Sequence, residues 1–106
     1  MFDTVLIANR GEIALRIGRS CRQLGLRTVA IHSEADAQAA YLRHADQSIC
    51  IGPAAPARSY LHPAAILLAA ELSGAQAIHP GYGFLSENAD FAAAVEQAGL
   101  VFVGPS

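Results

Sequence analysis

The 106-residue sequence contains no lysine and no tryptophan, and its seven basic residues are all arginines. Without lysine, the chain cannot supply a Schiff-base lysine, a Walker-type phosphate lysine or a kinase-type ATP lysine. Arginine can contact phosphate well. A nucleotide site that depends on lysine, however, must obtain it from outside this chain. The sequence therefore argues against a domain that uses ATP without help from other domains.

Strong charge, long apolar runs and paired cysteines are also missing. The formal net charge of −2 gives no basic surface for nucleic acid. No apolar run reaches the roughly 18 residues that a membrane span needs, and no signal peptide precedes Asp3. Cys21 and Cys50 form no CxxC pair, and we expect both to be buried and reduced. These features predict a cytoplasmic protein that binds neither nucleic acid nor membrane.

What is present is material for one folded domain, because 53% of the residues are hydrophobic. Residues 4–8 form an apolar, β-branched run typical of a strand buried on both faces. Ile13, Ile17, Cys21 and Leu24 then recur at helical spacing, and Gly25 follows as a helix terminator. The sequence thus opens with a strand and a helix.

The same alternation continues to the end of the chain. Further strands are predicted at residues 27–32, 48–51, 75–78 and 100–103. Helices are predicted at residues 38–45 and 63–72, with Pro63 in a first turn. A last helix is predicted after residue 87, with Phe91, Ala94, Val95 and Ala98 on one face and Gly99 at its end. Strands separated by helices imply right-handed crossovers and a parallel sheet. The predicted fold class is α/β, a Rossmann-like, doubly wound parallel sheet of about five strands.

Two loops follow strands at the edge where such sheets bind ligands. In the first, residues 8–12, we expect Asn9 to cap the helix and Glu12 to reach back to it. A dinucleotide-binding fingerprint needs three glycines here, and only Gly11 is present. The loop therefore argues against a nicotinamide or flavin site.

The second loop, residues 79–88, is dense in residues that can recognise a ligand. Gly81 and Gly83 flank Tyr82, which predicts a backbone that presents the tyrosine rather than burying it. Glu87 is expected in or beside the first turn of the last helix, where a carboxylate suits the helix dipole. His79 is interpreted as a hydrogen-bonded histidine at a strand end. The sequence shows no metal-ligand spacing and no nucleophile-elbow serine.

Two long motifs carry a family resemblance: VLIANRGEIALRI at residues 5–17 and AIHPGYGFLSEN at residues 77–88. Between and after them stand Ala35-Asp36, Ala45-Asp46, Ile51-Gly52-Pro53, Ser59-Tyr60-Leu61 and Phe102-Val103-Gly104-Pro105. In this order, they resemble the biotin carboxylases over essentially the whole chain.

The resemblance implies an ATP- and bicarbonate-dependent ligase that carboxylates biotin with Mg2+. It identifies residues 1–106 as the N-terminal, pre-ATP-grasp domain, with the ATP-grasp and C-terminal domains downstream. The fragment alone is expected to be inactive, with no catalytic residue and no tightly bound cofactor or metal of its own. Its implied partners are those downstream domains, a biotin carboxyl carrier domain and a carboxyltransferase.

The resemblance also assigns individual residues. It places Tyr82 and Gly83 near the biotin pocket and Glu87 behind the catalytic residues. Arg19 matches a dimer contact on the first helix, so a homodimer is expected for the full-length enzyme. Gln23 stands where an acidic residue is common, which puts the same charge pairing in doubt.

Three alternatives stay open at this point. The first concerns the parent enzyme, because the motifs are shared by carboxylases of several acyl-CoA esters, pyruvate and urea. The alanine-rich, lysine-free sequence favours an acyl-CoA carboxylase. A self-contained Rossmann-type nucleotide-binding module is a second interpretation. A non-catalytic interaction domain is the third.

Overall fold

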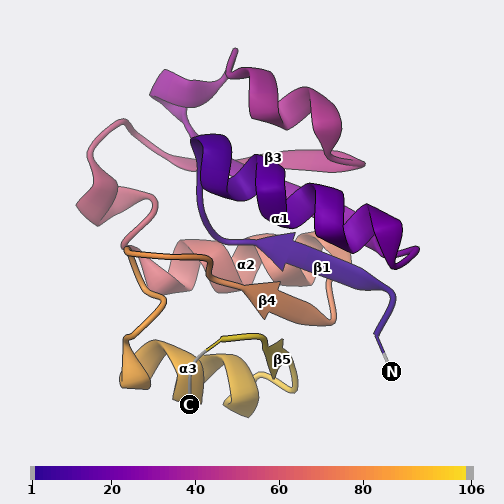
Figure 1. Ribbon diagram of the computed structural model, residues 1–106. Helices are drawn as coiled ribbons and strands as arrows, with labels where there is room; N and C mark the ends of the chain where they lie inside the picture. The colour runs from indigo at the N-terminus through magenta and orange to yellow at the C-terminus, as the bar shows by residue number, and fades with distance from the viewer. Residues whose placement is uncertain (1, 105–106) are drawn as a thin grey trace.

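The computed structural model describes residues 2–104, which form a five-stranded, all-parallel sheet in the order β3-β2-β1-β4-β5 (Figure 1). Its strands are β1 (Thr4–Ile7), β2 (Arg27–Ser33), β3 (Gln47–Gly52), β4 (Ala77–His79) and β5 (Val101–Phe102). All five predicted strands are present, with ends shifted by one or two residues. Pro105, which belongs to the last motif, and Ser106 lie outside the described residues.

Helices cover both faces of this sheet. Helix α1 (Gly11–Gln23) lies on one face, and helices α2 (Pro63–Ser73) and α3 (Ala89–Gln97) lie on the other (Figure 1). The predicted doubly wound α/β class is therefore confirmed. No helix within residues 2–104 combines the length and the apolar character that a membrane span needs.

The core follows from the complete burial of the central strand β1. Val5 and Ile7 pack toward α1, where they meet Cys21 and Ala14 respectively. Leu6 points to the opposite face and joins the larger cluster under α2 and α3. Alternate residues of β1 thus pack into the cores on the two faces of the sheet, which explains why the strand is a continuous apolar run.

The strand order reverses at β1, whose neighbours are β2 and β4. The chain leaves β1 and β4 at the same edge of the sheet, and the Ala8 amide donates to the His79 carbonyl across 2.8 Å. The two loops singled out in the sequence therefore emerge side by side at a topological switch point, the usual ligand position in open α/β sheets.

One predicted helix, at residues 38–45, is wrong in type and extent. The structure has a 3₁₀ turn, η1 (Glu34–Asp36), and a 3₁₀ helix, η2 (Ala40–His44). No side chain caps η2, and Ala45 is already extended as the chain enters β3. Five residues between extended ends are too few for a regular α-helix, and 3₁₀ geometry is common in such short pieces. The predicted loop before α2 likewise contains a 3₁₀ turn, η3 (Pro56–Arg58).

The prediction for the cysteines is half right. Both are free, and Cys21 is buried against Val5 and Ala77. Cys50 is exposed, because β3 pairs only with β2 at the sheet edge and its alternate residues face solvent. The sequence showed a strand but did not reveal that it lies at the edge.

Candidate functional site

Asn9 does not cap α1 as predicted. The helix begins at Gly11 behind Arg10, and no side chain caps it. Asn9 is instead buried between the two loops, with an exposed fraction of 1%. Its Nδ2 donates to the carbonyls of Pro80 (2.9 Å) and Tyr82 (2.6 Å), while its Oδ1 accepts from the Arg10 amide (2.8 Å). The capping box was the wrong interpretation because Asn9 lies where a second loop offers two carbonyls.

The loop after β4 presents Tyr82 as the sequence predicted. Gly81 and Gly83 have φ values of 66° and 69°, and the Tyr82 side chain is 75% exposed. At the strand end, His79 Nδ1 accepts a hydrogen bond from the Gly81 amide (3.1 Å), which confirms its predicted role. Burial lowers the pKa of His79, so the neutral ring that can accept this bond is favoured.

Glu87 is exposed and stands beside, not in, the first turn of α3. The cap is Asn88, whose side chain accepts from the Phe91 amide (2.9 Å). Glu87 lines an open groove of about 610 Å³ together with Glu96, Phe102 and Gly104. The hollow beside Tyr82 is a different one, formed against α1 by Ile13, Arg16, Ile17 and Ser20. The loop therefore carries both predicted residues, but they do not share a hollow.

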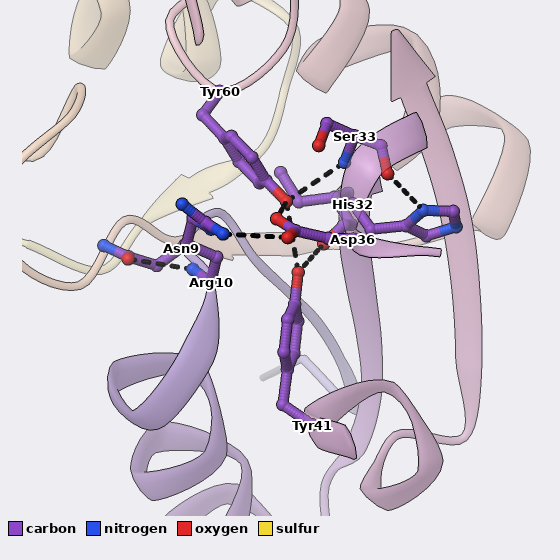
Figure 2. Close-up of polar contacts among 8 residues, drawn as sticks. Asn9, Arg10, His32, Ser33, Asp36, Tyr41 and Tyr60 are labelled. Carbon is purple, nitrogen blue, oxygen red and sulfur yellow. Dashed lines mark hydrogen bonds and ion pairs between the residues drawn. The ribbon is translucent and has the colours of Figure 1, made fainter. Parts of the chain in front are cut away.

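A polar cluster that the sequence did not predict lies beside the first loop (Figure 2). Arg10 forms an ion pair with Asp36 (2.8 Å), and the Tyr60 hydroxyl donates to the other oxygen of the same carboxylate. The Tyr60 oxygen in turn accepts from the Ser33 amide (3.0 Å). The Tyr41 hydroxyl donates to the Ile31 carbonyl (2.8 Å) and lies 3.2 Å from that of Tyr60.

The electrostatics of this cluster follow from its burial and pairing. Burial alone would raise the pKa of Asp36, but the hydrogen bond from Tyr60 and the Arg10 guanidinium hold that pKa below its ordinary value. The same ion pair raises the pKa of Arg10. Burial raises the pKa of both Tyr41 and Tyr60, so both hydroxyls stay protonated and can donate. The cluster is thus a charged pair bonded to the neutral phenol of Tyr60, with the second neutral phenol, Tyr41, beside it.

The cluster reaches the second loop through an aromatic stack. The rings of Tyr60 and Phe84 lie 5.2 Å apart at 22°, and the Arg10 guanidinium lies 5.6 Å from the Tyr60 ring centre. Asp36 and Tyr60 each belong to a short motif that contributed to the family resemblance. They are 24 residues apart, however, and no local spacing rule connects them. The family resemblance was the only signal in the sequence that could have drawn attention to them.

Arg19 lies on the exposed side of α1, and Gln23 is exposed one turn later. Both are accessible, as a contact between subunits would require. Arg16 and Ser20 of the same helix line the hollow beside Tyr82, and Arg19 does not. Different residues of α1 therefore face the Tyr82 loop and the proposed subunit contact.

The chemistry at Tyr82 suits a flat, neutral ring better than a triphosphate. A Cβ added to Gly83 would meet nothing within 4 Å, so the backbone beside the aromatic ring is open to an approaching ligand. No lysine is available to bind phosphate. Within residues 2–104, no group of three His, Cys, Asp or Glu side chains is placed to hold a metal ion. The site therefore offers an exposed aromatic ring with open backbone beside it.

Comparison with known proteins identifies the family of the chain. The model of the family "Biotin carboxylase, N-terminal domain" matches residues 1–106. The chain belongs to this family. The biotin carboxylase of Pseudomonas aeruginosa is 61% identical over 106 residues, which make up the whole of this chain and 24% of that protein. The mitochondrial propionyl-CoA carboxylase alpha chain of Rattus norvegicus is 53% identical over 104 residues, or 98% of this chain and 14% of that one.

Solved structures show the same fold. The biotin carboxylase of Campylobacter jejuni, crystallised as a β,γ-ATP complex, matches with a TM-score of 0.96 and 50% identity. That match covers all of this chain and 24% of the other. The chain thus spans about a quarter, or less, of the length of the biotin carboxylase relatives that it matches.

Proposed function

We propose that this chain acts as the first domain of a complete biotin carboxylase, whose ATP-grasp and C-terminal domains complete the active site. The observation that carries the proposal is the exposed Tyr82 between two glycines at the switch point. Its backbone carbonyl accepts a hydrogen bond from the buried Asn9. Membership of the family supports the reaction class, namely carboxylation of biotin with MgATP and bicarbonate.

In this proposal, the chain supplies one wall of the biotin pocket. Biotin, when bound, supplies the ureido nitrogen that is carboxylated. Tyr82 offers an apolar ring face that orients the biotin ring without competing for its nitrogens. Gly83 leaves the neighbouring backbone open for close approach. Glu87 lines a separate groove, and we propose that it acts on the catalytic residues and not on biotin itself.

The lysine-free sequence supports a division of labour between domains. MgATP and bicarbonate would be bound by the downstream domains, and biotin would arrive on a carrier domain that then serves a carboxyltransferase. The relatives include a propionyl-CoA carboxylase alpha chain but also a urea carboxylase and a pyruvate carboxylase. We prefer an acyl-CoA carboxylase as the parent because of the alanine-rich, lysine-free sequence. The free thiols of Cys21 and Cys50 fit a reducing compartment such as the cytoplasm.

The test of the proposed function is Tyr82→Ala in the full-length enzyme. Loss of the ring should raise the biotin KM by on the order of tenfold, since one aromatic contact is removed from the bound ring. The ATP KM should stay within about twofold, because no part of the triphosphate site is changed. Steady-state kinetics with free biotin measure both constants. An unchanged biotin KM would show that Tyr82 does not contribute to biotin binding.

A homodimer through α1 is proposed as well, on the exposure of Arg19. Arg19→Glu should shift the full-length enzyme toward the monomer in sedimentation velocity, because an arginine in a subunit contact is replaced by the opposite charge. Arg27→Glu, the same change at an exposed arginine of β2, is the matched control. Equal behaviour of the two variants would rule out a contact specific to Arg19.

A further inference from the structure

The exposed loop at Tyr82 is held by the side chain of Asn9, from the first loop. Asn9 is almost completely buried, and both N–H bonds of its amide are used on this loop, at the carbonyls of Pro80 and Tyr82. Its oxygen is used on the Arg10 amide. The bonds span 71 and 73 residues of sequence, so they fix the second loop to the first.

The backbone of the loop sits directly on this amide. A Cβ added to Gly81 would lie 2.8 Å from Asn9 Nδ2 and 2.9 Å from Ile13 Cγ2. In this arrangement the Tyr82 side chain lies at the surface. Glycine is required here for proximity as well as for its positive φ.

A second contact holds the other end of the loop. Phe84 has φ = 44°, a left-handed conformation that is unfavourable for a residue other than glycine and needs support from its surroundings. That support is the Tyr60 ring stacked on Phe84, and Tyr60 is itself fixed by Asp36 and the Ser33 amide. The segment from Gly81 to Phe84 is therefore held at both ends by buried side chains from earlier in the chain, Asn9 and Tyr60.

We infer that Asn9 is a positioning residue for Tyr82: its amide, assisted by the Tyr60–Phe84 stack, holds the loop in the one conformation that presents the tyrosine to the biotin ring. This inference rests on the proposed function for its ligand, but its structural half stands apart from it. Asn9 touches no reacting group and acts through the position of the loop, so its loss should affect biotin binding more than turnover.

Asn9→Asp is the sharpest variant because it keeps the size and shape of the side chain. It replaces two N–H donors by an oxygen that faces two carbonyl oxygens, so two hydrogen bonds become repulsive contacts. The matched control is Asn88→Asp, at the only other asparagine in the sequence. Asn88 accepts from the Phe91 amide, and a carboxylate accepts there equally well.

Hydrogen exchange in this chain measures the loop directly. The amides of Gly81 and Ser86 donate within the loop, to His79 Nδ1 and to the Gly83 carbonyl (3.1 and 2.9 Å). Both should exchange at least about tenfold faster in Asn9→Asp, because the loop opens more often. The Ala75 amide, which bonds to Ala70, should keep its rate. Asn88→Asp should leave Gly81 and Ser86 within about twofold of wild type. Unchanged exchange in Asn9→Asp would overturn the inference, whatever biotin does.

Kinetics of the full-length enzyme then test whether the loop matters for biotin. Asn9→Asp should raise the biotin KM on the order of tenfold, with the ATP KM unchanged and kcat at saturating biotin reduced less than the KM is raised. In the Tyr82→Ala background, the same substitution should add almost nothing, because Asn9 acts through Tyr82. Full additivity of the two substitutions would overturn the positioning role.

Two further results separate this inference from the proposed function. If Tyr82→Ala leaves the biotin KM unchanged, the proposed role of Tyr82 in biotin binding fails, and the role of Asn9 toward biotin fails with it. Hydrogen exchange then decides by itself whether Asn9 holds the loop. If Asn9→Asp does not fold, Phe84→Leu removes the stack at the other end of the loop. It should change the exchange and the biotin KM in the same direction by a smaller factor, and no change in either would overturn the inference.

Discussion

Tyr60 and Tyr82 are held near the same edge of the sheet in opposite ways. Tyr60 is 3% exposed and is fixed by its side chain, whose hydroxyl donates to Asp36 and accepts from the Ser33 amide. Tyr82 is 75% exposed and is fixed by its main chain, whose carbonyl accepts from Asn9. The same residue type is therefore structural at one position and free to meet a ligand at the other.

The difference shows how the domain can present a side chain precisely without using that side chain to do so. The Tyr82 loop is ordered by hydrogen bonds that join its backbone to the buried Asn9 and the half-buried His79. Across the described residues, every buried side-chain nitrogen or oxygen has a hydrogen-bond partner. A fully satisfied polar base of this kind is rigid. The phenol of Tyr82 thus remains free while its backbone is fixed.

The largest expected effect comes from a pair of glycines within this loop. Gly81→Ala should destabilise the chain by about 3 kcal/mol, because it adds overpacking against Asn9 and Ile13 to the cost of a positive φ. Gly83→Ala carries only the cost of its positive φ, about 1 kcal/mol, since a Cβ there meets nothing within 4 Å. Urea unfolding of the two variants measures the difference. Equal losses would mean that Gly81 is not seated on Asn9.

A smaller effect should separate the two tyrosines themselves. Tyr60→Phe keeps the stack on Phe84 but leaves the buried Ser33 amide without its acceptor, so we expect a loss of about 2 kcal/mol. Tyr82→Phe removes the same atom from an exposed ring and should change stability by less than about 0.5 kcal/mol. Thermal or urea unfolding distinguishes them. Similar values for both would show that the Tyr60 hydroxyl is not part of the support.

The sequence was sufficient for the fold because its signals are local. The run at residues 4–8 is buried on both faces, Pro63 is the first residue of α2, and Gly74 ends that helix with φ = 72°. Each of these features depends on a few consecutive residues. The predictions failed where a segment has no local preference that decides its structure, as in the five-residue 3₁₀ helix Ala40–His44.

The candidate site was predicted only in part, for the same reason. The exposure of Tyr82 follows from its flanking glycines, which are local. The role of Asn9 depends on carbonyls more than 70 residues away, and local rules favoured a helix cap instead. The pairing of Arg10 with Asp36 spans 26 residues and needs the β2–η1 connection to be known. Long-range polar pairs of this kind are set by the folded topology and leave no periodic trace in the sequence.

The last and smallest expected effect tests whether the charge of Asp36 supports the buried tyrosine. The pKa of Asp36 is lower in the folded chain than its ordinary value, because Tyr60 and Arg10 favour the carboxylate. Its contribution to stability is therefore fully present above the unfolded pKa of about 3.9 and is lost as the pH falls through the lower folded value. Asp36→Asn should cost about 1 kcal/mol at pH 7, and this difference from wild type should shrink below about pH 4.

The control for this prediction is Glu34→Gln, an exposed carboxylate on the same 3₁₀ turn, which should change stability by less than about 0.5 kcal/mol at pH 7. Urea unfolding of the three proteins between pH 7 and pH 3 gives the comparison. A loss in Asp36→Asn that stays constant with pH would mean that the side chain contributes through its shape and not through its charge. The support of Tyr60, and through it of Phe84, would then depend on neutral hydrogen bonds alone.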